Sequence, residues 1–179
     1  KVQAFLDGIG APRDTHDAIL SSGAACQRAL ASGRHGTRFH YVGPERDLHM
    51  LTDLGLAPVP EAEADAILCT GLADEARETP ADYAGPAARW AARGLPMLCA
   101  NPDIVVDRGA ERLFCAGAVA QAHEAAGGTV LWFGKPHAPI YDEAMALLAE
   151  IAGAPVPREA VLAIGDGIAT DIRGARAAG

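Results

Sequence analysis

Short apolar runs that end in a turn residue recur along the whole chain, and alanine-rich segments with helical spacing separate them. The runs lie at 18–21, 39–43, 66–71, 97–101, 113–117, 129–134 and 161–165, and each ends in Gly, Ser, Asn or Asp. The helical segments lie at 24–32, 45–54, 87–93, 118–126 and 140–152. Apolar runs of this length are typical of buried strands. Their alternation with helices predicts an α/β fold with a mainly parallel sheet.

Proline and glycine mark the expected helix boundaries. Thr79 is a candidate N-cap before Pro80, and Pro139 opens the helix at 140–152 in the same way. The Gly85-Pro86 pair predicts a break or restart in the helix that begins after Thr79. Glycines at the ends of the helical segments predict left-handed C-caps; they are Gly33, Gly55, Gly94, Gly127 and Gly153.

The charge balance excludes some classes of partner. The chain has 23 acidic and 15 basic residues among 179, a net charge of -8, which argues against a nucleic-acid or anionic-membrane surface. A small phosphorylated ligand remains compatible, because one lysine in a cleft can dominate the local field. No apolar run approaches the roughly 20 residues of a membrane span. The four cysteines form no C-x-x-C pair and no zinc spacing, so we expect free thiols and a cytoplasmic protein.

The segment 161–171 carries the strongest chemical signal. An apolar run ends in Gly165-Asp166, and a second acid, Asp171, follows at the start of a helix. A carboxylate at the carboxyl end of a parallel strand suits Mg²⁺. Two other interpretations stay open, since Asp166 is also typical of an ordinary turn. The string also resembles a degenerate dinucleotide fingerprint over Gly165, Gly167 and Thr170, although its two carboxylates would repel a pyrophosphate.

A second signal, Gly134-Lys135-Pro136-His137, follows the apolar run at 129–133. A lysine at the end of a buried strand needs an anionic partner, and a solvated turn lysine is the alternative. The Walker A spacing is absent. His137 is expected to orient its neighbours or to be exposed. Because a helix separates the two signals, a strand–helix–strand unit would place Lys135 and Asp166 on one sheet edge, an arrangement suited to phosphoryl transfer.

The two signals together resemble motifs III and IV of the haloacid dehalogenase superfamily. The strings at 134–137, 98–103 and 42–47 are more closely similar to its class IIA, the NagD-like and p-nitrophenylphosphatase-like hydrolases. The resemblance covers essentially the whole chain, in order. It implies a Rossmann-like core with an inserted α/β cap domain. The implied division is a first core segment at 1–35, the cap at 36–128, and a second core segment at 129–179.

The resemblance also implies a role for individual residues. Asp166 would ligate Mg²⁺, Asp171 would orient Lys135 or bind a metal-bound water, and Lys135 would offset charge on the nucleophile and the phosphoryl group. Asn101 and Asp103 would face the site from the cap and affect substrate choice. The implied activity is a Mg²⁺-dependent phosphatase that acts on a small phosphorylated metabolite through an aspartyl-phosphate intermediate. Copies of the chain could associate through the cap.

One departure limits the resemblance. The family's nucleophile lies in an Asp-x-Asp string on an N-terminal strand, and no such string occurs before residue 36. The Ser/Thr of motif II is also missing. The chain begins with the pattern of a helix interior, and it ends with a helix that reaches its C-cap Gly179 with no strand after it. We therefore expect an internal piece of a longer protein, with the nucleophile upstream and no activity alone. The alternatives are a non-catalytic Mg²⁺- and phosphate-binding regulatory protein that lacks motif I, and a nucleotide-dependent oxidoreductase.

Overall fold

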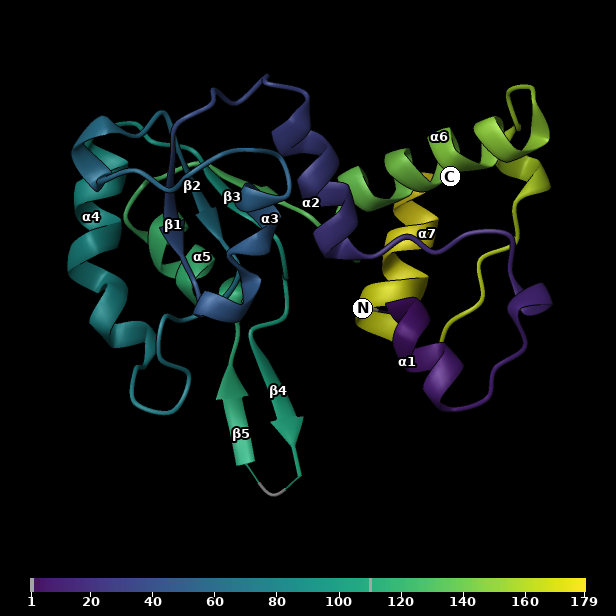
Figure 1. Cartoon of the computed structure of the whole chain (residues 1–179), viewed down its shortest axis with the longest axis horizontal. Helices are drawn as coiled ribbons and strands as arrows, with labels where there is room; N and C mark the ends of the chain where they lie inside the picture. The colour runs from purple at the N-terminus through teal and green to yellow at the C-terminus, as the bar shows by residue number, and fades with distance from the viewer. Residues whose placement is uncertain (1, 110) are drawn as a thin grey trace.

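The computed structural model describes residues 2–109 and 111–179, and its main sheet lies in one half of the molecule (Figure 1). Among these residues, four parallel strands pair in the order β1–β2–β3–β6, and β4 and β5 form an antiparallel hairpin. The strands are β1 (Phe39–Val42), β2 (Ala66–Cys69), β3 (Met97–Cys99), β4 (Val105–Arg108), β5 (Glu111–Phe114) and β6 (Val130–Trp132). The predicted α/β class with a parallel sheet is confirmed.

The helices follow the sequence pattern closely. Over the described residues the α-helices are α1 (Val2–Gly8), α2 (Ser22–Ala31), α3 (His49–Thr52), α4 (Ala84–Ala92), α5 (Ala116–Ala125), α6 (Ala138–Ala152) and α7 (Arg173–Ala178). Gly153 ends α6 with a φ of 69°, the left-handed cap that the sequence predicts. The expected break at Gly85-Pro86 is displaced, because α4 starts at Ala84 and Pro86 falls in its first turn. Proline is tolerated at this position, because a backbone N–H in the first turn of a helix has no partner within the helix.

Helices cover both faces of the parallel sheet. Side chains alternate along each strand, so Ile67 of β2 lies in one buried cluster and Leu68 in the other. Helices α4 and α5 close the first face, where Trp90 and Val119 are buried. Helices α2 and α3 close the second face, where Leu30 of α2 and Leu51 of α3 are buried. All four β2 residues are buried, as the continuous apolar run predicts for a central strand.

Two predicted strands do not form. The runs at 18–21 and 161–165 are extended chain without strand pairing in the described structure, and Leu162 and Ile164 are 83% and 89% exposed. A strand requires a neighbour for its backbone hydrogen bonds, and no described segment pairs with either run. The predicted strand–helix–strand unit of Lys135 and Asp166 is therefore wrong. Strand β6 pairs with β3 instead, in the register Leu98 to Leu131.

The sheet extends past the predicted cap limit at residue 128, since β6 is its fourth strand. Helix α2, predicted in the first core segment, packs on the same sheet. The division at 1–35, 36–128 and 129–179 stays a prediction. Helices α1, α6 and α7 and both chain ends lie in the other half of the molecule, and the β4–β5 hairpin projects from the sheet (Figure 1). None of the described helices has the length and apolar character needed to cross a membrane.

Candidate active site

Lys135 follows β6, after the buried residues Phe133 and Gly134. Its ammonium group forms an ion pair and hydrogen bond with the carboxylate of Asp171, which lies in the helical turn directly before α7. The Lys135 side chain is 51% exposed, whereas that of Asp171 is 16% exposed. The anionic partner that the sequence predicted for this lysine is thus a carboxylate of the chain itself.

Three groups hold the Asp171 carboxylate in place. Besides Lys135, the backbone N–H of Gly167 donates to Oδ2 at 3.2 Å, and the Thr170 hydroxyl donates to the same oxygen at 3.3 Å. The hydrogen bond from Lys135, followed by the bond from Gly167, lowers the pKa of Asp171 below its ordinary value. All of these contacts stabilise the ionised carboxylate, so the pair is a fixed positive–negative unit at neutral pH.

Asp166 lies in the loop that wraps around Asp171. A Cβ on Gly165 would stand 2.4 Å from the Asp171 Cβ, and one on Gly167 would stand 2.2 Å from the Thr170 hydroxyl. Only glycine allows this close approach, which brings the Asp166 backbone to the Lys135–Asp171 pair. Asp166 itself is exposed. The structure therefore brings these three predicted residues together without a shared sheet edge.

The loop of Asn101 and Asp103 follows β3, and two glycines hold it beside Lys135. The Asn101 Oδ1 accepts a hydrogen bond from the Asp103 N–H at 3.2 Å, which closes a local turn. A Cβ on Gly117 would stand 2.3 Å from the carbonyl oxygen of Pro102, and one on Gly134 would stand 2.7 Å from the Pro102 ring. Because Gly134 precedes Lys135, the ends of β3 and β6 bring the two predicted groups to neighbouring positions.

Sequence reasoning missed Tyr141, which positions the Asp171 turn from α6. Its hydroxyl donates to the carbonyl oxygens of Thr170 and Asp171, each at 3.4 Å, and burial raises its pKa. His137 stacks on Trp132 with ring centroids 5.1 Å apart, and burial lowers its pKa. The prediction that His137 orients rather than reacts agrees with this packing. A tyrosine in the first turn of a helix gives no local signal for such a role.

The carboxylates of Asp166 and Asp171 could supply only part of the ligands of a Mg²⁺ site. Asp171 is held by Lys135, which leaves Asp166 as the exposed carboxylate of this loop. No group of three or more metal-ligating side chains gathers anywhere in residues 2–109 and 111–179. Mg²⁺ commonly keeps several waters and binds one or two carboxylates together with substrate phosphate. Asp166 suits that partial role as a single hard ligand.

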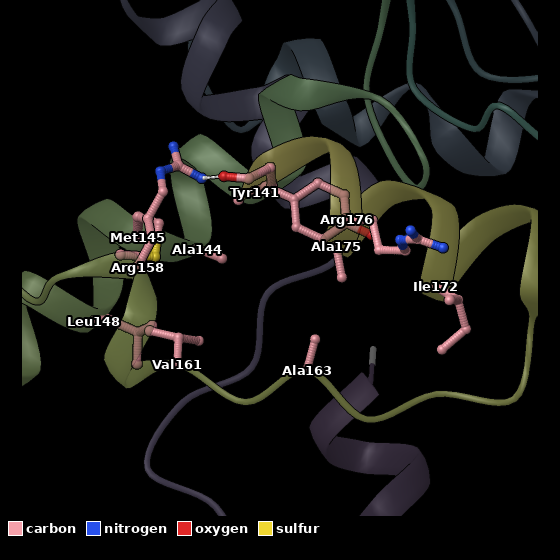
Figure 2. Close-up of a pocket in the computed structure, with 12 residues that line it drawn as sticks. Tyr141, Ala144, Met145, Leu148, Arg158, Val161, Ala163, Ile172, Ala175 and Arg176 are labelled. Atoms are coloured by element: carbon pink, nitrogen blue, oxygen red, sulfur yellow. Dashed lines mark hydrogen bonds between the residues drawn. The ribbon is translucent and has the colours of Figure 1, made fainter.

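The geometry excludes a dinucleotide site at residues 165–170 and a phosphoryl site in a nearby groove. The glycines of the dinucleotide-like string contact Asp171 and Thr170, and no strand precedes them, so their backbone is not open to a pyrophosphate. A groove of about 380 Å³ lies between α6, α7 and residues 158–163, and Figure 2 shows the residues that line it. Met145, Leu148, Val161 and Ile172 make it largely apolar, which is unlike a site for a charged phosphoryl group.

Comparisons with known proteins point to one family. The family model described as HAD-hydrolase-like matches residues 132–179, which contain Lys135, Asp166 and Asp171. No curated protein matches the chain. Its structure is similar to that of a haloacid dehalogenase-like hydrolase from Brucella suis 1330, with 40% identity and a TM-score of 0.83. That match covers 98% of this chain and 64% of the Brucella chain.

Two further solved structures are similar at lower identity. A glycerol phosphate phosphatase from Mycobacterium tuberculosis, in complex with calcium, shares 27% identity with a TM-score of 0.64, over 99% of this chain and 50% of that one. A p-nitrophenyl phosphatase from Archaeoglobus fulgidus shares 21% identity with a TM-score of 0.72, over 98% and 64%. The latter shows likeness of fold alone. The chain thus spans between half and 64% of the length of these three proteins.

Proposed function

Because this chain belongs to the haloacid dehalogenase-like family of hydrolases, we propose that it carries a portion of the active site of a Mg²⁺-dependent phosphatase. The observation that carries the proposal is the Lys135–Asp171 pair with Asp166 in the same loop. A fixed cation beside a free carboxylate is suited to a phosphoryl group and its counter-ion. The solved glycerol phosphate phosphatase of 27% identity supports the same reaction class.

In the proposed reaction, an aspartate outside these residues attacks a phosphate monoester. Its carboxylate oxygen bonds to phosphorus while the phosphorus–oxygen bond to the organic group breaks, and the departing oxygen takes up a proton. Water then attacks the phosphorus of the acyl phosphate and releases inorganic phosphate. Lys135 holds the phosphoryl oxygens, and Asp171 keeps the lysine oriented. Asp166 would hold Mg²⁺, which supplies further compensation of negative charge.

The finer details of the proposal rest on individual features. Assignment to class IIA is supported by the Asn101–Asp103 loop, which lies beside Lys135 and would contact the substrate. Magnesium is favoured because the related glycerol phosphate phosphatase has been solved in complex with magnesium. A second structure of that phosphatase contains calcium. A cytoplasmic location is supported by four free cysteines. Self-association through the cap, residues 36–128, belongs to the same set of proposals.

The test compares variants of the full-length protein in hydrolysis of p-nitrophenyl phosphate. We expect Asp166→Asn to nearly abolish turnover and to weaken the dependence on Mg²⁺. Lys135→Ala should lower the rate on the order of a hundredfold, as loss of a charge-stabilising group does. The exposed Asp53, at the end of α3, provides the control Asp53→Asn, which should retain activity. An Asp166→Asn protein with wild-type turnover at limiting Mg²⁺ contradicts the proposal.

The same variants distinguish a phosphatase from the non-catalytic alternative, a protein that only binds Mg²⁺ and phosphate. A full-length protein that binds Mg²⁺ and phosphate through Asp166 and Lys135, yet hydrolyses no phosphate monoester, would be a binding protein rather than a phosphatase. Isothermal titration with Mg²⁺ and inorganic phosphate gives that binding independently of activity.

A further inference from the structure

The carboxylate of Asp166 has no partner within the described part of the chain. Asp166 is exposed, and no hydrogen bond or ion pair joins its side chain to residues 2–109 or 111–179. Glycine lies on both sides of it, at Gly165 and Gly167, and residues 161–167 belong to neither a helix nor a strand. Because glycine is the least restricted residue in backbone rotation, few contacts fix the Asp166 side chain relative to the peptide bond that follows it.

An exposed aspartate that precedes glycine can react with its own backbone. The Gly167 nitrogen attacks the side-chain carboxyl carbon of Asp166 and a C–N bond forms. The N–H hydrogen, one carboxyl oxygen and a proton from solvent leave as water, and a cyclic imide results. Water then adds to one imide carbonyl carbon and breaks its C–N bond. Opening at the side-chain carbonyl restores aspartate, whereas opening at the main-chain carbonyl gives isoaspartate. Glycine presents no Cβ that would hinder the ring closure.

The contact that opposes this ring closure is the hydrogen bond of the attacking nitrogen. The Gly167 N–H donates to Asp171 Oδ2 at 3.2 Å, so the hydrogen that must leave is shared with a carboxylate. Asp171 is itself held by Lys135. A Cβ on Gly165 would stand 2.4 Å from the Asp171 Cβ, so the loop fits tightly around this side chain. Asp171 therefore restrains the peptide bond between Asp166 and Gly167.

The sequence contains one other Asp-Gly pair, Asp7-Gly8, which lies at the end of α1. The Asp7 carboxylate accepts hydrogen bonds from Arg13 at 2.8 and 3.2 Å and from Gln3 at 2.9 Å. Ring closure there requires these bonds to break and the end of the helix to open. Closure in the loop at 165–167 requires the loss of one hydrogen bond of the described structure. The two pairs therefore share their local chemistry and differ in their restraint.

We propose that Asp166-Gly167 is a site of spontaneous conversion to isoaspartate, and that the Asp171 carboxylate restrains the reaction. Isoaspartate adds one methylene group to the main chain and leaves a carboxylate attached directly to Cα. In a loop that fits tightly around Asp171, the longer main chain displaces this carboxylate from the Lys135–Asp171 pair. The modification thus removes a group of the candidate active site without a change in mass. It does so whether or not Asp166 binds Mg²⁺.

The experiment incubates the chain at pH 7 and 37 °C in ¹⁸O-labelled water and follows the peptides that contain each Asp-Gly pair by mass spectrometry. Each opening of the imide incorporates one ¹⁸O atom, and electron-transfer fragmentation distinguishes isoaspartate from aspartate. In the folded wild-type chain, label and isoaspartate at Asp166 should exceed those at Asp7 about tenfold, because more hydrogen bonds hold Asp7. In urea, where neither pair is restrained, the two positions should react at similar rates.

Variants of Asp171 test the restraint. Asp171→Ala should raise the rate at Asp166 roughly fivefold and leave the rate at Asp7 unchanged, because one hydrogen bond to a charged acceptor is lost. Asp171→Asn keeps an acceptor oxygen and should give a smaller rise. The exposed Asp53 provides the matched control Asp53→Ala, which should change neither rate.

Equal labelling of the two positions in the folded wild-type chain would overturn the proposal. An Asp171→Ala chain that reacts at Asp166 no faster than wild type would overturn it as well. A rise at both positions in Asp171→Ala would report unfolding, and Asp171→Asn then decides. A rise confined to Asp166 in that variant supports the restraint, and no rise overturns it.

Discussion

Lys135 is half-exposed, yet its position is well defined because its partner is. The Asp171 carboxylate is bonded to Gly167 and Thr170, and the carbonyl oxygen of Asp171 accepts from the Tyr141 hydroxyl. A charged group fixed in this way needs little rearrangement when a phosphoryl group arrives, which is where electrostatic stabilisation is most effective. The cysteines contrast with this cluster. Burial raises the pKa of Cys69 to about 12, so its thiol is inert.

The ion pair makes a prediction about stability against pH. Because the folded-state pKa of Asp171 is lowered, its stabilising contribution is present above its ordinary pKa of about 4 and is lost as pH falls through the lowered value. Asp171→Asn should therefore lower Tm at pH 7, and the difference from wild type should vanish in acid. Thermal melts followed by circular dichroism from pH 7 to pH 2 measure it.

Two further variants isolate the pair. Lys135→Met should lower Tm at pH 7, and Lys135→Met/Asp171→Asn should lose less than the sum of the single variants, because the two charges act together. Asp53→Asn serves again as the exposed control. A Tm difference for Asp171→Asn that persists at pH 2 would mean that the carboxylate acts through shape rather than through its charge.

At the scale of elements, the start of α5 sets the position of the Asn101–Asp103 loop. The Gly117 N–H donates to the Asp103 carbonyl oxygen at 3.0 Å, and a Cβ there would overlap the Pro102 carbonyl. Gly117→Ala should therefore destabilise the protein by about 1–3 kcal/mol through overpacking. Urea unfolding measures this change.

The control is Gly23→Ala, in the first turn of α2. A Cβ there would meet nothing nearer than the Ser21 hydroxyl at 3.9 Å, so alanine should stabilise by about 0.5–1 kcal/mol. A Gly117→Ala protein as stable as wild type would show that the loop is free to move, and would contradict a fixed position of the loop beside Gly134 and Lys135.

The elements that sequence predicts well are the apolar runs that pair with a neighbouring strand in the central sheet. The runs at 39–43, 66–71, 97–101 and 129–134 became β1, β2, β3 and β6, which form the central sheet. The run at 161–165 has the same local pattern and is not a strand, because pairing depends on a distant neighbour rather than on composition. The sequence pattern does not mark strand β4, because Val-Val-Asp-Arg is half polar and the side chains of Val105, Val106 and Asp107 are exposed.

The candidate site was only partly predictable, for a similar reason. The spacing of Gly165, Asp166 and Asp171 encodes a loop that closes on itself, so their proximity is local and can be inferred from sequence. The partnership of Lys135 with Asp171 was also expected from the family resemblance. The predicted strand–helix–strand unit was wrong, because β6 pairs with β3 and places Lys135 near the Asn101 loop.

At the scale of the whole molecule, the two halves differ in how completely they bury apolar side chains. The sheet half contains both buried clusters, with Ile67, Leu68 and Leu98 fully buried. In the other half α6 has no buried residue, and Leu162 and Ile168 are more than four-fifths exposed. Independent stability is therefore expected to reside in the sheet half, which includes α2 and β6.

The last prediction concerns the boundaries of the sheet half. A piece spanning residues 20–134 retains α2, β6 and both clusters, so it should fold alone and melt cooperatively. The piece 36–128 lacks Leu30 and Phe133, which are buried against the sheet. It also lacks the backbone hydrogen bonds on either side of β6, from Met97 N–H to the Thr129 oxygen and from Phe133 N–H to the Cys99 oxygen. Each buried side chain of this size contributes about 2 kcal/mol, a large share of the 5–15 kcal/mol typical of a domain.

The pieces 20–128 and 36–134 separate the effects of β6 and α2. We expect dispersed NMR signals and a sharp melt from 20–134 only, and a cooperative melt of 36–128 at the same Tm would show that α2 and β6 lie outside the folding unit.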